Sequence, residues 1–221
     1  MKNYFKKQEK EVLSMIIETK ELKFSIPGAD DITNWVTQNK ELRTLLNPLW
    51  IGIAEDTIAQ IDKIFTLSAN FELVKESVTA RIRESGAEQV VRINNTTRDA
   101  IREALTEGIE NQEGIPDLRN RVMSVFEDAS RRRATVIART ETHNTVGTAT
   151  FGTYQSAKVE KKQWLTAIDG RERPSHADVN GEIKGINEQF SNGLMYPGDP
   201  NGAPEEVIQC RCVLLPIIPD F

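Results

Sequence analysis

The chain is poor in the side chains that build disulfides and metal centres, with only two cysteines and two histidines among its 221 residues. The two cysteines are one residue apart, a spacing at which a disulfide would be badly strained, so we expect no disulfide framework. Aromatic residues make up only 6% of the chain and hydrophobic residues 38%. This composition favours exposed helices around a thin core over a thick α/β core.

Long hydrophobic runs are also missing. No run approaches the roughly 18 apolar residues that a helix needs to span a bilayer. The first seven residues, MKNYFKK, are charged and lack the apolar stretch of a secretion signal. We therefore expect a soluble protein that is made in a cytosol and has no membrane partner.

A basic surplus is absent as well, because 28 basic residues stand against 33 acidic ones and the net charge is −5. A surface that neutralises many phosphates needs such a surplus, so strong general binding to DNA is not expected. Basic residues are concentrated only locally, at Arg131, Arg132, Arg133, Lys158, Lys161 and Lys162. These side chains can form an ordinary solvated surface, or they can make a weak, salt-sensitive contact with double-stranded DNA.

Apolar residues recur at helical spacing through the first 128 residues and predict a series of helices. One helix is expected to begin after an N-cap at Asp30 or Asp31 and to stop at Pro48. Another is expected to end at Gly86, with Asn94–Thr97 capping the helix that follows. Residues 1–128 are therefore interpreted as a helical body.

Residues 129–221 are predicted to hold one long helix and a small α+β lobe. The helix runs from Ala129 to about Ser156 and contains Gly147 and Gly152. Glycine costs a helix interior about 1 kcal/mol relative to alanine, so we expect another element to pack closely there. The remaining pattern predicts a strand over 161–167, a turn at 169–170, a helical turn over 174–178, a short strand over 182–184, an ordered loop over 191–204 and a closing strand over 207–218. The predicted fold class is α+β, a mostly helical N-terminal body with a small C-terminal α+β lobe.

Both histidines and both cysteines lie within residues 143–212, which suggests a single site. Residues two apart on an extended strand point to the same side, so Cys210 and Cys212 can present two thiolates together. With His143 and His176 they would complete a tetrahedral zinc site of the structural kind. The alternative is that the cysteines are buried small side chains and that His176 hydrogen-bonds a loop.

Charged side chains near these ligands predict a polar network that joins the long helix to the lobe. Its members are Arg139, Glu141, Asp169, Arg173 and His176. Such groups usually form hydrogen-bonded ion pairs that hold loops in place. Some of them could also act as acid–base groups, so a metal-dependent hydrolase acting on nucleic acid or peptide is the rival function. The sequence contains no nucleophile elbow, phosphate-binding glycine loop or His-Glu-x-x-His helix, and we assign no catalytic residue.

Several motifs of the C-terminal half occur in an order that resembles one protein family. They are Arg139–Thr142, Trp164–Ala167 followed by Asp169, Arg173 and His176, then Phe190, Pro197–Pro200 and Cys210–Cys212. Together they resemble the phage Mu F-like minor head proteins over about residues 90–216.

The resemblance implies a structural role in head morphogenesis and no enzymatic activity. It implies that the partners are the portal protein, capsid or scaffold proteins, and packaged double-stranded DNA. The location that it implies is the capsid interior of the virion, after assembly in the host cytoplasm.

Overall fold

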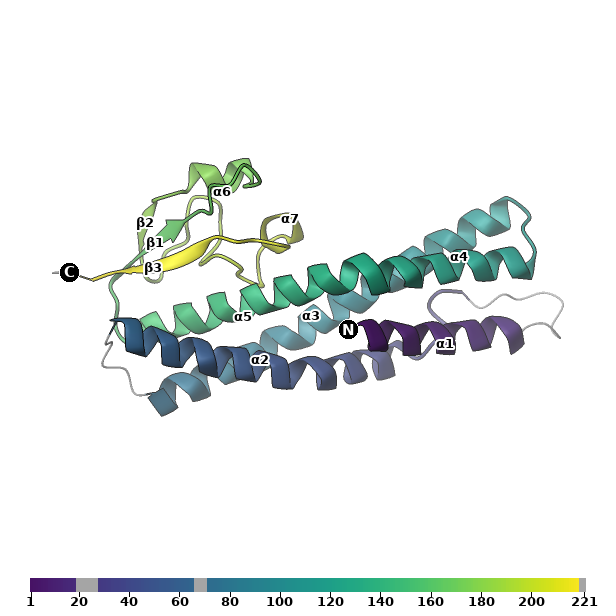
Figure 1. The fold of residues 1–221 in the computed structure, drawn as a ribbon, viewed down its shortest axis with the longest axis horizontal. Helices are drawn as coiled ribbons and strands as arrows, with labels where there is room; N and C mark the ends of the chain where they lie inside the picture. The colour runs from purple at the N-terminus through teal and green to yellow at the C-terminus, as the bar shows by residue number, and fades with distance from the viewer. Residues whose placement is uncertain (19–27, 66–70, 219–221) are drawn as a thin grey trace. The chain divides into compact units, whose positions relative to one another are not determined.

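The computed structural model describes residues 1–18, 28–65 and 71–218, and within them the chain is mostly helical with one small sheet near its C-terminal end (Figure 1). The elements in chain order are α1 (Lys2–Glu18), α2 (Trp35–Phe65), α3 (Phe71–Glu110), α4 (Ile115–Asp128), the π-helical turn η2 (Ala129–Arg133), α5 (Ala134–Ser156), β1 (Lys161–Leu165), α6 (Pro174–Asp178), β2 (Ile183–Gly185), α7 (Pro204–Val207) and β3 (Val213–Ile217). The predicted α+β fold class is confirmed. No helix in the described part of the chain has both the length and the apolar character of a membrane span.

The chain forms two compact units that interleave along the sequence. The first comprises residues 1–45 and 87–138, and the second comprises residues 46–86 and 139–221. The sequence-based division into 1–128 and 129–221 stays a prediction. Helices α2, α3 and α5 each contribute residues to both units.

Helix α2 is longer than predicted because it continues through Pro48 instead of ending there. Proline inside a helix removes one hydrogen bond and costs about 3 kcal/mol. Beyond it, Trp50, Ala54 and Ile58 recur every four residues and are buried, so the packing of one helix face outweighs this cost. The predicted N-cap is also corrected, since Asn34 accepts a hydrogen bond from the backbone N–H of Thr37 at 3.0 Å.

Helix α3 likewise passes through both breaks that its sequence predicts. At Gly86, an added Cβ would overlap the indole of Trp50, so the glycine makes room for a buried ring. In the segment Asn94–Thr97, the hydroxyl of Thr96 donates to the carbonyl of Arg92 at 3.0 Å, a bond that a threonine makes inside a helix. These polar side chains therefore lie within one continuous helix, where the sequence suggested capping residues.

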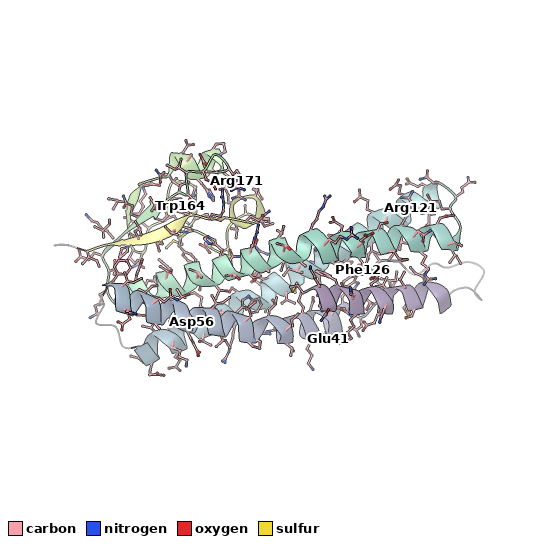
Figure 2. The ribbon with its side chains drawn as sticks, viewed as in Figure 1. Glu41, Asp56, Arg121, Phe126, Trp164 and Arg171 are labelled. Atoms are coloured by element: carbon pink, nitrogen blue, oxygen red, sulfur yellow. The ribbon has the colours of Figure 1, made fainter. Side chains whose placement is uncertain are left out.

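The first unit is built around two fully buried phenylalanines, Phe5 and Phe126, the second of which is labelled in Figure 2. A buried polar contact accompanies them. The hydroxyl of Tyr4 donates to Oδ1 of Asn94 at 2.8 Å, and the amide of Asn94 donates to Asn39 at 2.8 Å. Since an unpaired buried amide would be costly, these bonds specify how α1, α2 and α3 meet within this unit.

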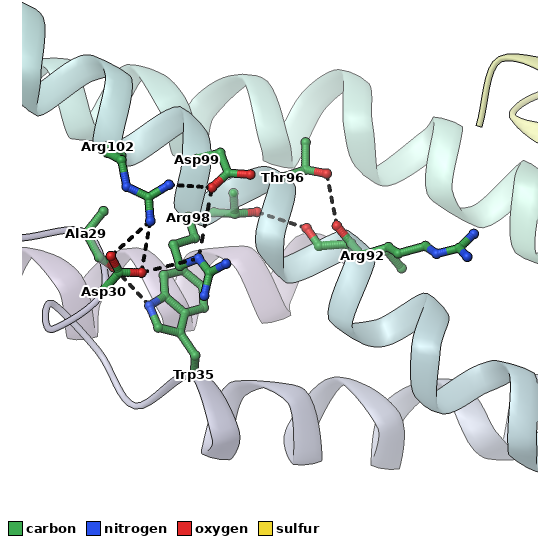
Figure 3. Close-up of polar contacts among 10 residues, drawn as sticks. Ala29, Asp30, Trp35, Arg92, Thr96, Arg98, Asp99 and Arg102 are labelled. Atoms are coloured by element: carbon green, nitrogen blue, oxygen red, sulfur yellow. Dashed lines mark hydrogen bonds and ion pairs between the residues drawn. The ribbon is translucent and has the colours of Figure 1, made fainter. Parts of the chain in front are cut away.

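The turn before α2 is held by a second polar cluster of the first unit (Figure 3). The indole N–H of Trp35 donates to the carbonyl of Ala29 at 2.9 Å. Arg102 binds both carboxylate oxygens of Asp30 at 2.9 Å and also donates to Asp99 at 2.7 Å. Exposed ion pairs contribute little stability, so this cluster mainly fixes the path of the chain into α2.

The predicted long helix does not begin as a new element at Ala129. The π-helical turn η2 joins α4 directly to α5, and the helix ends at Ser156 as predicted. Arg133 in this turn donates to Thr97 and to the carbonyl of Ile93, and its guanidinium lies 5.6 Å from the centre of the Phe5 ring. A local π-helical turn shifts the side chains that follow it, so it changes which face of the helix they occupy.

The lobe of the second unit is a three-stranded antiparallel sheet in the order β2-β1-β3, beside α5 (Figure 1). In the register of the central strand, Trp164 lies opposite Leu214 of β3 and Lys162 lies opposite Lys184 of β2. The hydroxyl of Tyr154 on α5 donates to the carbonyl of Leu214 at 3.2 Å, which ties the helix to the sheet. The predicted strand, helical turn and short strand are confirmed, whereas the predicted closing strand is shorter and follows helix α7.

Two glycines of α5 do allow close packing, as their sequence predicts. A Cβ at Gly147 would overlap the backbone carbonyl oxygen of Pro197, in the loop that precedes α7. A Cβ at Gly152 would lie 2.7 Å from Cγ2 of Val78 on α3. The small face of α5 therefore contacts the lobe at one point and a neighbouring helix at the other.

Replacing Gly147 with alanine is expected to lower the free energy of unfolding by about 2 kcal/mol, because overpacking forces backbone apart. Urea unfolding at constant pH measures the change. Gly52→Ala is the matched control, since it is also a helix position of the second unit and has nothing within 4 Å of the new Cβ. The control should gain up to about 1 kcal/mol from helix propensity. Equal effects at both positions would contradict the close packing.

Candidate metal centre

Three potential metal ligands meet in the lobe of the second unit. Cys210 and Cys212 lie between α7 and β3, His176 lies on α6, and all three are buried. Nδ1 of His176 is 3.8 Å from Sγ of Cys210 and 3.3 Å from Sγ of Cys212. The three ligand atoms all lie within 4.8 Å of one another. The structure thus brings together three of the four residues that the sequence predicted as ligands.

The ring of His176 is held from both sides. Its backbone carbonyl accepts a hydrogen bond from the hydroxyl of Thr166 at 2.6 Å, and that hydroxyl in turn accepts the indole N–H of Trp164 at 3.1 Å. The indole packs edge to face against the imidazole with ring centres 5.2 Å apart. Figure 2 shows Trp164 among the side chains of the lobe. These contacts direct Nδ1 toward the two thiols.

The other ring nitrogen of His176 faces a carboxylate. Nε2 lies 2.9 Å from Oε2 of Glu206, although the alignment does not meet that of a hydrogen bond. The hydroxyl of Ser175 lies 3.0 and 2.9 Å from the two oxygens of Glu206 and donates to this carboxylate. Glu206 is therefore held against the imidazole on the side opposite the thiols.

The pKa values of the two thiols are shifted in opposite directions. A hydrogen bond from Cys210 lowers the pKa of Cys212, and the bond to His176 lowers it further, while burial acts in the opposite direction. The same interaction with Cys212, together with burial, raises the pKa of Cys210. The pair thus favours one thiolate and one thiol, and a thiolate is the form of cysteine that binds metals.

His143 lies near this cluster, on α5. Its Nε2 is buried and has no hydrogen-bond partner among the described residues. A Cβ at Gly198 would lie 2.7 Å from Cδ2 of the His143 ring, so this glycine makes room for the imidazole. Burial lowers the pKa of His143, and Cys212 and His176 are near enough to affect that pKa as well.

The predicted polar network is only partly assembled. Asp169 is paired with Arg211, whose second nitrogen donates to the carboxylate at 2.8 Å, and this pairing lowers the pKa of Asp169 to about 2. Arg173 donates to the carbonyl of Ile208. These contacts connect the loop before α6 with the segment around the cysteines. They hold the lobe together and do not reach the long helix.

The other two members of that network lie elsewhere. Glu141 is buried and accepts the indole N–H of Trp50 at 3.1 Å, and burial raises the pKa of Glu141 to about 7. Arg139 is exposed, and within the described chain no hydrogen bond or ion pair joins it to the other four residues. Instead, the hydroxyl of neighbouring Thr140 accepts the backbone N–H of Gln209 at 3.1 Å. At this point of α5 the contact with the lobe is thus made by a residue that the network did not include.

Two residues of the site were missed by sequence reasoning. Arg211 stands between the cysteines, and on extended chain it must point away from both, which was an available signal. Glu206 had no such signal, because only the fold of α7 brings it to His176.

The basic residues proposed for DNA contact separate into two groups. Arg131 and Arg132 are 78% and 86% exposed, and each pairs with an acidic residue one helical turn earlier. Lys158 and Lys161 are also exposed. Arg133 is occupied by the contacts described above, and Lys162 is fully buried. Lys162 is therefore withdrawn from the DNA-contact residues, because on β1 it faces the lobe interior.

Comparison with known proteins identifies the family. The family model described as Phage Mu protein F like protein matches residues 95–215, which run from the second half of α3 to β3. An uncharacterized protein of Bacillus subtilis, YqbB, is 30% identical over 59% of this chain and 44% of its own length. An uncharacterized protein of Haemophilus influenzae is 25% identical over 71% of this chain and 30% of its own length.

A further relative carries an enzyme name. The NAD(+)–arginine ADP-ribosyltransferase EFV of Enterococcus faecalis is 31% identical over 41% of this chain, which is 20% of that protein. The chain thus spans less than half the length of each of these relatives. No solved structure matches the chain. Because the family model covers more than half of its residues, the chain belongs to the Phage Mu protein F like family, a structural family of phage head-related proteins.

Proposed function

We propose that this chain acts in phage head morphogenesis by binding the portal protein on the capsid interior. The observation that carries the proposal is the family match over residues 95–215. The matched range includes the lobe, the helix α5 that packs against it, and α4. The part that defines the family is therefore a helical support with its lobe, and we assign the partner surface to this part.

The polar groups of the lobe support a positioning role over a catalytic one. The ammonium group of Lys162 donates to the carbonyls of Ile186 and Met195, both at 2.8 Å, and lies 4.8 Å from the centre of the Phe151 ring. Burial lowers the pKa of Lys162 to about 8, so it stays mostly protonated at neutral pH. Buried groups that are fully bonded to their own chain specify a fold and leave little to act on a substrate.

Asp199 is used in the same way, in the loop between β2 and α7. Its buried carboxylate accepts the backbone N–H groups of Met195 at 3.2 Å and Asn201 at 3.0 Å. A carboxylate that accepts backbone N–H groups closes a loop on itself. The rival reading as a metal-dependent hydrolase would need such acidic groups to be directed at a substrate. The enzyme named among the relatives does not favour it, because the alignment covers only a fifth of that protein.

The proposal is tested by expressing the chain together with the portal protein encoded in the same phage genome. We expect a complex that survives affinity purification and size exclusion at about 200 mM salt, where weak phosphate contacts are largely lost. The portal protein of an unrelated phage is the control and should not co-purify. Failure of the folded chain to bind its own portal would contradict the proposed partner.

Double-stranded DNA is the other proposed partner, and it is tested separately by gel shift over a salt series. The exposed pair Arg131 and Arg132 is changed to glutamine, because these side chains lie on the surface of the helix. We expect weak binding that disappears by about 200 mM salt and weakens further in the double variant. Unchanged binding by the variant would contradict a DNA contact at these arginines.

A further inference from the structure

We propose that the lobe binds one zinc ion through Cys210, Cys212 and Nδ1 of His176, with Nε2 of His143 as the fourth ligand. The site is structural, because four protein ligands leave no open position for a substrate. All four residues belong to the second unit. The proposal is independent of portal binding, since its test measures metal content.

The distances between ligand atoms fit a zinc ion. With Zn–S bonds of about 2.3 Å and Zn–N bonds of about 2.05 Å at tetrahedral angles, sulfur and nitrogen ligands are about 3.5 Å apart. The two distances from Nδ1 of His176, 3.3 and 3.8 Å, lie on either side of this value. Both distances are therefore compatible with one zinc ion bound by His176 and the two cysteines, whose ligand atoms all lie within 4.8 Å of one another.

The surroundings of His176 are those of a metal ligand. Histidines that bind metals usually present their second ring nitrogen to a carboxylate, which orients the ring and strengthens the donor atom. Glu206 occupies this position, 2.9 Å from Nε2, and Ser175 holds the carboxylate in place. A buried histidine with thiols on one side and a carboxylate on the other is explained by a metal between the imidazole and the thiols.

His143 supplies the fourth ligand. Its Nε2 is buried without a hydrogen-bond partner among the described residues, and leaving such an atom unpaired costs about 1 to 3 kcal/mol. Coordination to zinc would remove this cost. The ring comes from α5, so the ion would connect the long helix to α6 and to the segment between α7 and β3.

The ligand types select zinc over the hard cations. Thiolate and imidazole donors suit zinc, whereas magnesium and calcium require oxygen ligands. Zinc binds both cysteines as thiolates, so any proton that the pair still carries passes to solvent, and the two thiolates neutralise the charge of the ion. A lobe with three short strands has a small core, so a metal link between its segments would contribute much of its stability.

The first measurement is the metal content of the purified full chain, followed by replacement of zinc with cobalt(II). We expect one zinc per chain, and a cobalt protein with a thiolate-to-cobalt charge-transfer band and the strong visible bands of four-coordinate cobalt. Cys210→Ser, Cys212→Ser and His176→Asn should each lower zinc content at least tenfold. His143→Asn should weaken binding and change the visible bands, and unchanged bands would overturn its role as the fourth ligand.

Glu206→Gln and Glu205→Gln form a matched pair, because the two carboxylates are neighbours on α7 and only Glu206 faces His176. Glu206→Gln should weaken zinc binding about 10- to 100-fold while Glu205→Gln binds as the unmodified chain does. This pair also decides the matter if the cysteine variants do not fold. Absence of both zinc and a cobalt charge-transfer band in the folded chain would overturn the proposal, as would full zinc content in Cys212→Ser.

Discussion

Replacing Trp164 with alanine is expected to unfold the C-terminal lobe while the helices remain. The indole is fully buried and packs edge to face against His176 and Phe190, with ring centres 5.2 and 5.3 Å away. Loss of such a side chain costs about 3 to 5 kcal/mol, which is a large share of the stability of a small lobe. Hydrogen exchange of the amides of residues 161–217 measures the loss of protection directly.

Two comparison variants make this result specific. Trp164→Phe keeps an aromatic ring but loses the N–H that binds Thr166, so it should lose only about 1 to 2 kcal/mol. Trp35→Ala removes a half-buried indole from the first unit and should leave exchange in residues 161–217 unchanged. All samples are kept at the same metal content, because a bound ion shifts apparent stability. Protected lobe amides in Trp164→Ala would show that the tryptophan is not central to the lobe.

Glu141→Gln is expected to remove a large part of the pH dependence of stability. Burial raises the pKa of Glu141 from 4.5 to about 7, and the hydrogen bond from Trp50 only partly offsets this. Between these two values the native protein holds a proton that the unfolded chain has lost. The native protein therefore has the full stability contribution of protonated Glu141 below a pH of about 4.5, and it loses this contribution as the pH rises through 7. The difference corresponds to about 3 kcal/mol, at about 1.4 kcal/mol for each pH unit.

The measurement is urea unfolding at several pH values from 5 to 8. The glutamine variant keeps an oxygen acceptor for the indole of Trp50 but cannot ionise, so relative to the unmodified chain it should gain stability at pH 8. Glu103→Gln is the matched control, because it makes the same change at an exposed position of α3. A difference between the unmodified chain and Glu141→Gln that stays constant from pH 5 to 8 would contradict the raised pKa.

Strand β1, helix α6 and strand β2 could be predicted because their signals are local, whereas helix α7 was not predicted. A short run of residues before a turn predicted the strand that contains Trp164, and Pro174 marked the start of the helical turn. The order of motifs was enough to indicate the family, and the family model confirms it. The long helices could not be bounded in this way. Pro48 and Gly86 carry strong local signals for a break, but burial of Trp50 between α2 and α3 overrides both.

In the candidate site, too, local spacing could be predicted and the pairing of distant side chains could not. The spacing of Cys210 and Cys212 predicted that both thiols would lie on one side of an extended chain, and in the structure both lie close to His176. The pairing of Asp169 with Arg211, of Glu141 with Trp50 and of Glu206 with His176 was not predicted. Charge alone does not determine which of several opposite charges a side chain meets.

The sequence by itself determined the family, the fold class and the region in which the candidate metal ligands lie. Each depends on residue types and spacings within short stretches, and such local signals do not depend on the tertiary arrangement of the chain. The tertiary structure alone decided where α2 and α3 end, which basic residues are buried, and which partner each charged side chain has. These outcomes depend on packing between segments far apart in sequence, where the burial of one large side chain outweighs a local preference of a few kcal/mol.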